Sequence, residues 1–120
     1  MKNYFMIAFI VSSLALFAQE SQTNLTKGKQ LTIDHACTAC HKERGPLHAP
    51  GFSGIGWKHK KADKEYAMDT ISKIIAQGSK GQYPHFNKSI MPPYAYLPEK
   101  DRLTIATYIL SLSNKKVIKK

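Results

Sequence analysis

The stretch Cys37-Thr38-Ala39-Cys40-His41 places two thiols three residues apart, with an imidazole directly after the second thiol. On a helical turn, side chains at positions i and i+3 project from the same face. Cys37 and Cys40 can therefore each form a thioether with one vinyl group of a haem, while His41 reaches the iron. The pentad predicts one covalently attached haem c and a fold that is built around it.

Other uses of a Cys-x-x-Cys-His pattern fit this chain less well. Zinc needs four ligands, and the sequence has no second pair of cysteines. A redox-active dithiol needs a strand-to-helix context that the flanking residues do not supply. An exported chain can form a disulfide between Cys37 and Cys40. So short a loop is strained, however, and gains little entropic stabilisation. Covalent haem attachment is therefore the favoured hypothesis.

The first eighteen residues predict export. Lys2 is followed by a mostly apolar run from Tyr4 to Phe17, which ends at Ala18. Such a segment is typical of a secretory signal peptide. The alternative is a retained membrane anchor, but the run is shorter than the roughly 20 residues that a spanning helix needs. We therefore predict a signal peptide over residues 1–18, a periplasmic or otherwise exported location, and no stable membrane insertion.

The remaining residues, 19–120, are enough for a single small domain. Because Lys2 is the only charged residue of the signal, this mature chain keeps 17 basic and 8 acidic residues, a net charge of 17 − 8 = +9. So large a positive charge favours electrostatic steering toward an acidic protein partner. Nucleic acid is disfavoured, because only Arg44 and Arg102 are arginines and no aromatic-basic repeat is present.

The hydrophobic pattern predicts helices joined by loops, without a strand, and therefore an all-α fold. The predicted helices cover residues 24–37, 64–77 and 98–112. Gly78 is expected to end the second helix, because glycine commonly follows the last helical residue. Residues 42–61 are rich in glycine and proline and are predicted to be irregular.

Met91 lies in the loop between the second and third predicted helices and is followed by two prolines, which restrict the backbone. A thioether sulfur is a soft iron ligand that raises the reduction potential relative to a second imidazole. We therefore predict Met91 as the distal iron ligand, opposite His41. Packing in the core is the other common role of a methionine.

Three histidines compete with Met91 for this position. His48 lies only seven residues from His41, a tether that hinders passage round the haem edge. His59 and His85 have more reach, although solvated loop positions are the commoner place for such histidines. A vacant sixth position, suited to gas binding, is the remaining alternative.

Beyond the pentad, the chain resembles the class I monohaem cytochromes c, and among them the small bacterial c-551-like group. The resemblance covers most of the mature chain and is carried by Gly28-Lys29-Gln30-Leu31, the pentad, Ala49-Pro50, Ile55, Lys58, Gly78-Ser79-Lys80-Gly81, Met91-Pro92-Pro93 and residues 105–112. It implies the cytochrome c fold, with three to five helices wrapped around one covalently attached haem c.

The resemblance also implies residues that support the haem. In this family a proline carbonyl accepts the second ring N–H of the ligand histidine and fixes its tautomer. Pro50 matches the family spacing to His41 better than Pro46 does. Tyr83 stands at a position similar to that of a tryptophan that donates to a haem propionate, and its hydroxyl can serve the same purpose. An ordinary loop aromatic is the alternative for Tyr83.

The family packs its first helix crosswise on its last through a small residue, which corresponds to Gly28 against Tyr108 here. The sequence departs from the family at two places. Thr32 stands at a position where the family usually has an aromatic residue. Ile33 is therefore expected to fill the space that the aromatic ring would occupy. Tyr94 replaces an asparagine that follows the Met-Pro-Pro segment in some relatives.

These observations predict a periplasmic electron carrier, and not an enzyme, in which His41 and Met91 fill both axial positions while the iron cycles between Fe(III) and Fe(II). The expected partner is an acidic redox protein or enzyme, such as an oxidase, a quinol complex or a periplasmic dehydrogenase. Lys42, Lys58 and Lys88 are expected to surround the exposed haem edge.

Two other functional classes remain open. One is a haem-based sensor or ligand-binding module with a displaceable sixth ligand, and the other is a cytochrome subunit of a periplasmic oxidoreductase. A peroxidase would need an open distal site with an acid-base residue.

Overall fold

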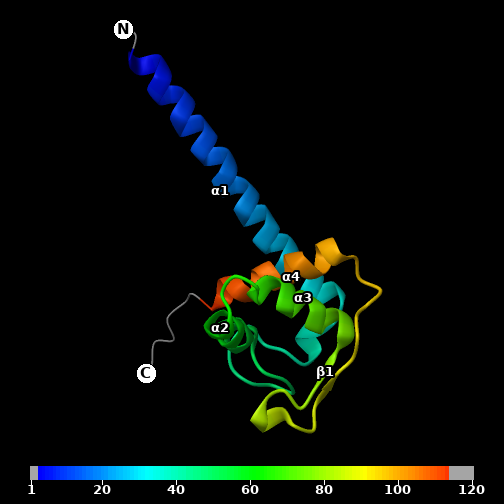
Figure 1. Ribbon diagram of the computed structural model, residues 1–120. Helices are drawn as coiled ribbons and strands as arrows, with labels where there is room; N and C mark the ends of the chain where they lie inside the picture. The colour runs from blue at the N-terminus through cyan, green and yellow to red at the C-terminus, as the bar shows by residue number, and fades with distance from the viewer. Residues whose placement is uncertain (1–2, 114–120) are drawn as a thin grey trace.

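The computed structural model describes residues 3–113, and the side chains of residues 15–113. In this part of the chain four α-helices carry most of the structure (Figure 1): α1 (Asn3–Asp34), α2 (Phe52–Ala62), α3 (Ala67–Gln77) and α4 (Glu99–Leu112). The predicted all-α class is therefore confirmed. Among these helices, none is both long and apolar enough to cross a membrane.

Helix α1 is one continuous helix whose N-terminal half extends away from the other helices (Figure 1). The predicted start near Asn24 is wrong, because neither glycine nor proline interrupts the chain between Asn3 and Gly28. The predicted cleavage point after Ala18 lies inside this helix.

The C-terminal part of α1 packs on α4, and Gly28 lies against Tyr108 as the family resemblance implied. The expectation for the neighbouring positions is wrong. Ile33 stays 49% exposed, whereas Thr32 is buried. The Thr32 hydroxyl donates to the carbonyl of Lys29 at 2.6 Å, and this hydrogen bond lets a polar side chain occupy the interior.

Helix α2 corrects the prediction that residues 42–61 are irregular. The segment holds several glycines, which lower helix propensity, but packing against α4 overrides this preference. Gly56 is one reason: a Cβ atom at this position would lie 2.8 Å from the carbonyl oxygen of Ile109 in α4. The glycine therefore allows two helix backbones to approach closely.

Helix α3 starts three residues later than predicted, because the carboxylate of Asp63 accepts hydrogen bonds from the backbone N–H groups of Glu65 and Tyr66 and forms a turn. Its predicted end at Gly78 is confirmed, with φ +73° at that glycine. The predicted helix after Pro98 is also confirmed, and it ends at Leu112.

Helix α4 lies at the centre of the molecule and packs on α1, α2 and α3. The buried hydrophobic residues that form the core are Phe52, Ala67, Ile71, Ile75, Leu97, Ile105, Ala106, Tyr108, Ile109 and Leu112. This arrangement leaves one side of α2 and α3 free to line a cavity.

A two-stranded antiparallel ladder closes the segment between α3 and α4. It consists of β1 (Ser79–Lys80) and β2 (Ile90–Met91), with Ser79 opposite Met91. No strand was predicted here, because two-residue strands are too short to show an alternating hydrophobic pattern. The ladder fixes the backbone of Met91 next to the end of α3.

Candidate functional site

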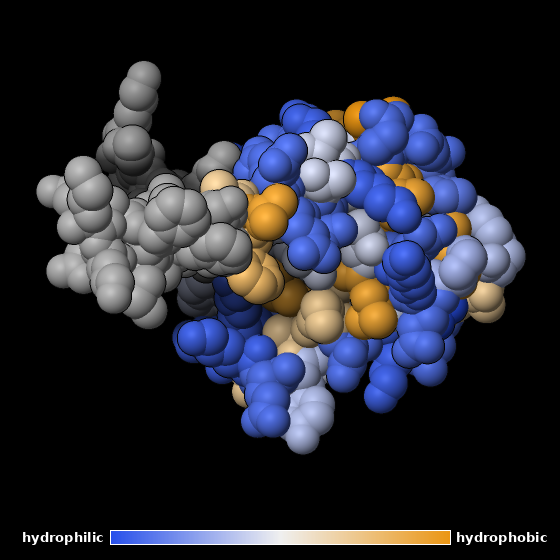
Figure 2. All heavy atoms as spheres, turned by 90° about the horizontal axis from the view of Figure 1, so that it is seen from above, coloured by the Kyte–Doolittle hydropathy of each residue, from blue (hydrophilic) through white to orange (hydrophobic). Residues whose placement is uncertain are grey.

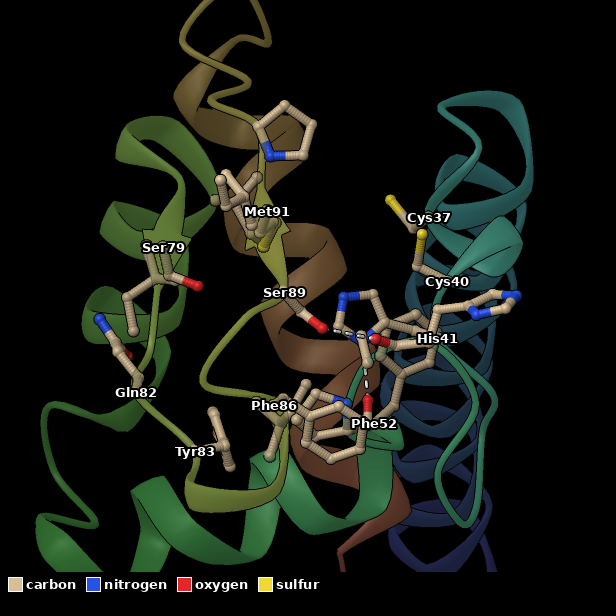
Figure 3. Close-up of a pocket in the computed structure, with 18 of the residues that line it drawn as sticks. Cys37, Cys40, His41, Phe52, Ser79, Gln82, Tyr83, Phe86, Ser89 and Met91 are labelled. Atoms are coloured by element: carbon tan, nitrogen blue, oxygen red, sulfur yellow. Dashed lines mark hydrogen bonds between the residues drawn. The ribbon is translucent and has the colours of Figure 1, made fainter.

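One cavity brings together every residue that the sequence predicted for attachment, ligation or support of a haem (Figure 3). These residues are Cys37, Cys40, His41, Pro50, Tyr83 and Met91. The cavity holds about 1020 Å³ of empty space, including the part that is open to solvent.

The walls of the cavity come mainly from apolar side chains of two helices. Phe52 and Ile55 of α2 form one wall, and Ile71, Ile74 and Ile75 of α3 form another. The three isoleucines recur at helical spacing and therefore share one face of α3. Such a lining favours an apolar ligand over water.

A tight turn positions the two thiols. After α1 the backbone of Ala36 adopts a left-handed conformation (φ 57°), and the 3₁₀-helix η1 (Cys37–Ala39) follows. The Cys37 carbonyl accepts hydrogen bonds from the N–H groups of Cys40 at 3.2 Å and His41 at 2.9 Å. Figure 3 shows both sulfur atoms side by side at one end of the cavity. Burial raises the pKa of the Cys37 thiol, so this group stays protonated at neutral pH.

Both cysteines are free thiols. Within residues 3–113, no group of three His, Cys, Asp or Glu side chains lies together in a way that could hold a metal ion. The described part of the chain thus offers neither the disulfide nor the ligand set of a zinc site, and the two thiols face the cavity.

His41 is held from two sides. Its Nδ1–H donates to the carbonyl oxygen of Pro50 at 2.7 Å (Figure 3), so Pro50, and not Pro46, is the hydrogen-bond partner. Its ring stacks on Phe52, with centroids 5.3 Å apart and planes 19° apart, and Phe52 in turn meets the ring of Tyr108 edge-on.

Burial lowers the pKa of His41, and the hydrogen bond to Pro50 opposes this shift. The imidazole is therefore neutral near pH 7, with its proton on Nδ1. This tautomer leaves the Nε2 lone pair available to a metal ion.

Met91 lies across the cavity from His41 (Figure 3) and is half-buried. The ladder between β1 and β2 fixes its backbone on one side. On the other side, the N–H of Tyr94 donates to the carbonyl of Ile75 at 2.9 Å, which ties the segment after Met91 to α3. Imidazole and thioether therefore lie on opposite sides of one cavity.

The competing histidines do not share one environment. His48 and His59 line the cavity, whereas His85 does not. Burial, with a smaller contribution from the charge of Lys58, lowers the pKa of His59, which is therefore neutral near pH 7. The carbonyl of His48 accepts a hydrogen bond from Ser89.

Tyr83 lines the cavity with a hydroxyl group that is buried and has no hydrogen-bond partner among the described residues. Burial raises the pKa of Tyr83. The ammonium of Lys58 lies 3.9 Å from the centroid of the Tyr83 ring and donates to the carbonyl of Gln82 at 3.0 Å. A buried donor without a partner is rare in proteins and fits a ligand that brings its own acceptor, such as a haem propionate.

Among the residues that line the cavity, sequence reasoning missed Phe52, Phe86 and Ser89 in particular. None of them belongs to a recognisable motif. Phe52 was missed because its helix was not predicted, although Phe52, Ile55 and His59 recur at helical spacing and all face the cavity. With the two thiols, the imidazole, the thioether and the unpartnered hydroxyl in one apolar cavity, the residues present fit a covalently bound haem.

Comparisons with known proteins show the family of this chain. The family model described as cytochrome c matches residues 25–113. The crystal structure of wild-type cytochrome c552 from Nitrosomonas europaea superposes with a TM-score of 0.60 and 28% sequence identity, covering 70% of this chain and 98% of that chain. No curated protein sequence matches. The chain therefore belongs to the cytochrome c family, whose members bind haem c covalently and transfer electrons.

Proposed function

We propose that this protein is a periplasmic electron carrier that holds one haem c through Cys37 and Cys40, with His41 and Met91 as the axial ligands. The observation that supports this most strongly is the placement of imidazole and thioether on opposite sides of one cavity that also holds both thiols (Figure 3). A haem bound there supplies a one-electron Fe(III)/Fe(II) couple. Because protein side chains fill both axial positions, no substrate binds at the metal, and the protein is not an enzyme.

The surrounding residues have distinct supporting roles in this proposal. The carbonyl of Pro50 keeps the proton of His41 on Nδ1, and Phe52 fixes the plane of the ring. The isoleucines of α3 exclude water from the cavity, which limits solvent access to the metal. Tyr83 donates its otherwise unpartnered hydroxyl to a propionate.

Export and partner choice follow from the sequence. Residues 1–18 act as a cleaved signal peptide, and residues 19–120 form the single domain. The face in Figure 2 is mostly hydrophilic where it is described, as suits a carrier that diffuses between partners. The net charge of the mature chain, 17 − 8 = +9, steers it toward an acidic redox partner.

Exposed Lys42 and Lys88 are available for this steering. Lys58 is less available, because its ammonium is held by Gln82 and Tyr83. The acidic partner is an oxidase, a quinol complex or a dehydrogenase. The rate of electron transfer between this protein and its partner should fall as salt screens these charges.

The test is to co-express the chain with haem-attachment machinery and record the ferric spectrum. We expect the weak red charge-transfer band of sulfur-ligated iron in the wild type. Met91→His should abolish the band and lower the reduction potential, because a second imidazole favours the ferric state. The double variant Cys37→Ala, Cys40→Ala should release its haem into acidified organic solvent.

A band that survives in Met91→His would show that the axial assignment is wrong. Ready binding of carbon monoxide to the reduced wild type would instead favour a sensor with a displaceable ligand. N-terminal sequencing of the exported protein tests the signal peptide, because cleavage after Ala18 leaves Gln19 first.

A further inference from the structure

The segment that carries Met91 is joined to the haem-attachment side of the cavity at two points, one before and one after the methionine. Before it, the hydroxyl of Ser89 donates to the carbonyl oxygen of His48 at 3.1 Å (Figure 3). His48 belongs to the loop that follows the pentad, so this hydrogen bond connects two sides of the cavity that lie 41 residues apart in the sequence.

The second connection consists of three aromatic rings, which we call the aromatic clasp: His35, Tyr94 and Tyr96. The rings of Tyr94 and Tyr96 have centroids 5.8 Å apart, and those of Tyr96 and His35 have centroids 6.0 Å apart. Both separations are typical of attractive aromatic pairs. Because His35 comes two residues before Cys37, the clasp links the start of the attachment turn to the segment after Met91.

The three rings of the clasp differ in their relation to the cavity. Tyr94 is half-buried and lines it, whereas Tyr96 and His35 do not. Tyr96 is 69% exposed. Removing its ring therefore creates no buried void, and the variant should fold. Tyr96 acts on the cavity indirectly, through its contacts with Tyr94 and His35.

Among the described residues, few backbone hydrogen bonds hold this segment, although Met91 and Tyr94 also pack against the hydrophobic core. The ladder that pairs Met91 with Ser79 is only two residues long on each strand. Pro92 and Pro93 have no backbone N–H to donate. The next backbone hydrogen bond along the chain is the one from Tyr94 to Ile75.

The geometry points to a specific role for these contacts: the aromatic clasp and the Ser89–His48 hydrogen bond hold Met91 over the cavity and limit its exchange for external ligands. This inference rests on the proposed ligation of the iron by Met91. Tyr96 and Ser89 are positioning residues in this account, because each acts through the backbone that carries Met91.

The test uses the holoprotein, with imidazole as the external ligand. Exchange is followed by the loss of the sulfur-to-iron charge-transfer band after rapid mixing. Tyr96→Ala removes both ring pairs and should accelerate exchange about tenfold, which corresponds to about 1.4 kcal/mol. Ser89→Ala removes one neutral hydrogen bond and should accelerate it about fivefold.

Two control variants separate the clasp from a general effect of mutation. Tyr96→Phe keeps the ring and should exchange within about twofold of the wild type. Tyr66→Ala removes a tyrosine of similar exposure (56%) that lies outside the cavity lining, and it should also stay within about twofold. Amide hydrogen exchange gives an independent readout, because residues 89–97 should open faster in Tyr96→Ala than in Tyr96→Phe while α3 stays protected.

Two results would overturn the inference. One is a normal charge-transfer band in Tyr96→Ala with wild-type exchange kinetics, and the other is equal acceleration in Tyr66→Ala. Failure of the proposed function looks different, because the wild-type protein would then lack the band before any variant is compared.

Discussion

Gly28 of α1 lies so close to Tyr108 of α4 that a Cβ atom at position 28 would stand 2.6 Å from the Cβ atom of Tyr108. It would also stand 2.6 Å from the carbonyl oxygen of Thr104. Neither the carbonyl oxygen of Thr104 nor the Cβ atom of Tyr108 can move without the backbone of α4. Gly28→Ala must therefore separate the two helices. We expect a loss of about 1–3 kcal/mol in the free energy of unfolding, reduced by at most about 1 kcal/mol through the better helix propensity of alanine. Urea unfolding of the holoprotein measures it.

Gly54 of α2 provides the matched control. It is also a helical glycine, but no atom of the described residues lies within 4 Å of the Cβ position there. Gly54→Ala should therefore stabilise the protein by up to about 1 kcal/mol. If Gly28→Ala and Gly54→Ala changed the stability in the same direction, close packing of α1 on α4 would not explain why position 28 is a glycine.

The Tyr108 hydroxyl also joins α4 to the loop after the pentad. It donates to Oε1 of Glu43 at 2.6 Å, and the ammonium of Lys29 lies 3.0 Å from the same oxygen. Hydrogen bonds to charged groups contribute more than neutral ones, so Tyr108→Phe should lower the free energy of unfolding by about 1.5–3 kcal/mol near pH 7. A loss below about 0.5 kcal/mol would show that solvent replaces this hydrogen bond without penalty.

The same contact predicts a dependence on alkaline pH. Burial, followed by the hydrogen bond and the charge of Glu43, raises the pKa of Tyr108 above its ordinary value of about 10. The unfolded chain then releases this proton at lower pH than the folded protein does. The stabilisation is therefore fully present below about pH 10 and is lost as the pH rises above it.

Comparison with Tyr108→Phe isolates this effect, because the pKa values of Tyr83 and Tyr94 are also raised by burial. The difference in unfolding free energy between wild type and Tyr108→Phe should shrink between about pH 9 and 11. A constant difference over that range would contradict the assignment to Tyr108.

Features encoded by neighbouring residues could be predicted from the sequence. The turn of the Cys37–His41 pentad, the end of α3 at Gly78 and the start of α4 after Pro98 each depend on residues within one or two turns of chain. Helix α2 could not be predicted in this way. Its glycines oppose a helix locally, and long-range packing on α4, such as the close approach of Gly56 to Ile109, 53 residues away, explains why a helix forms.

The residues of the site likewise divide into those that local sequence reveals and those that depend on long-range contacts. His41 and Met91 were predicted because their residue types suit iron ligation, and both line the cavity. Phe52 and Ser89 were missed because their roles arise from long-range contacts: Ser89 meets His48 across the cavity, and Phe52 is useful only once its helix has brought it under the imidazole. No local pattern encodes such contacts.

Tyr83 offers a test of the haem environment. Its buried hydroxyl has no hydrogen-bond partner among the residues that the structure describes, and in the proposed function it donates to a propionate. Tyr83→Phe removes the donor, leaves the propionate charge less neutralised and so favours the ferric state. The reduction potential should fall by up to about 60 mV, the equivalent of a tenfold change for one electron. Tyr66→Phe, at an exposed position, should leave it unchanged, and an unchanged potential in Tyr83→Phe would remove the propionate contact from the proposal.

Gly78 connects the end of α3 to Met91. Its φ of +73° is unfavourable for other residues, and a Cβ atom there would lie 2.5 Å from the carbonyl oxygen of Met91. Gly78→Ala should therefore destabilise the protein by about 1–3 kcal/mol and also displace the backbone of the ligand. The ferric protein should lose much of its sulfur charge-transfer band, and its reduction potential should fall.

Gly45 separates backbone strain from displacement of Met91. It has nearly the same φ, +75°, but nothing lies within 4 Å of its Cβ position. Gly45→Ala therefore carries the same conformational penalty as Gly78→Ala, but its new methyl group does not contact the segment that carries Met91. We expect it to lower the unfolding free energy and to keep the full charge-transfer band. Charge-transfer bands of equal strength in Gly78→Ala and Gly45→Ala would contradict this prediction. The Met91 backbone would then have moved away from the new methyl group while the sulfur stayed in place. In that case close packing at Gly78 would not determine the position of the ligand.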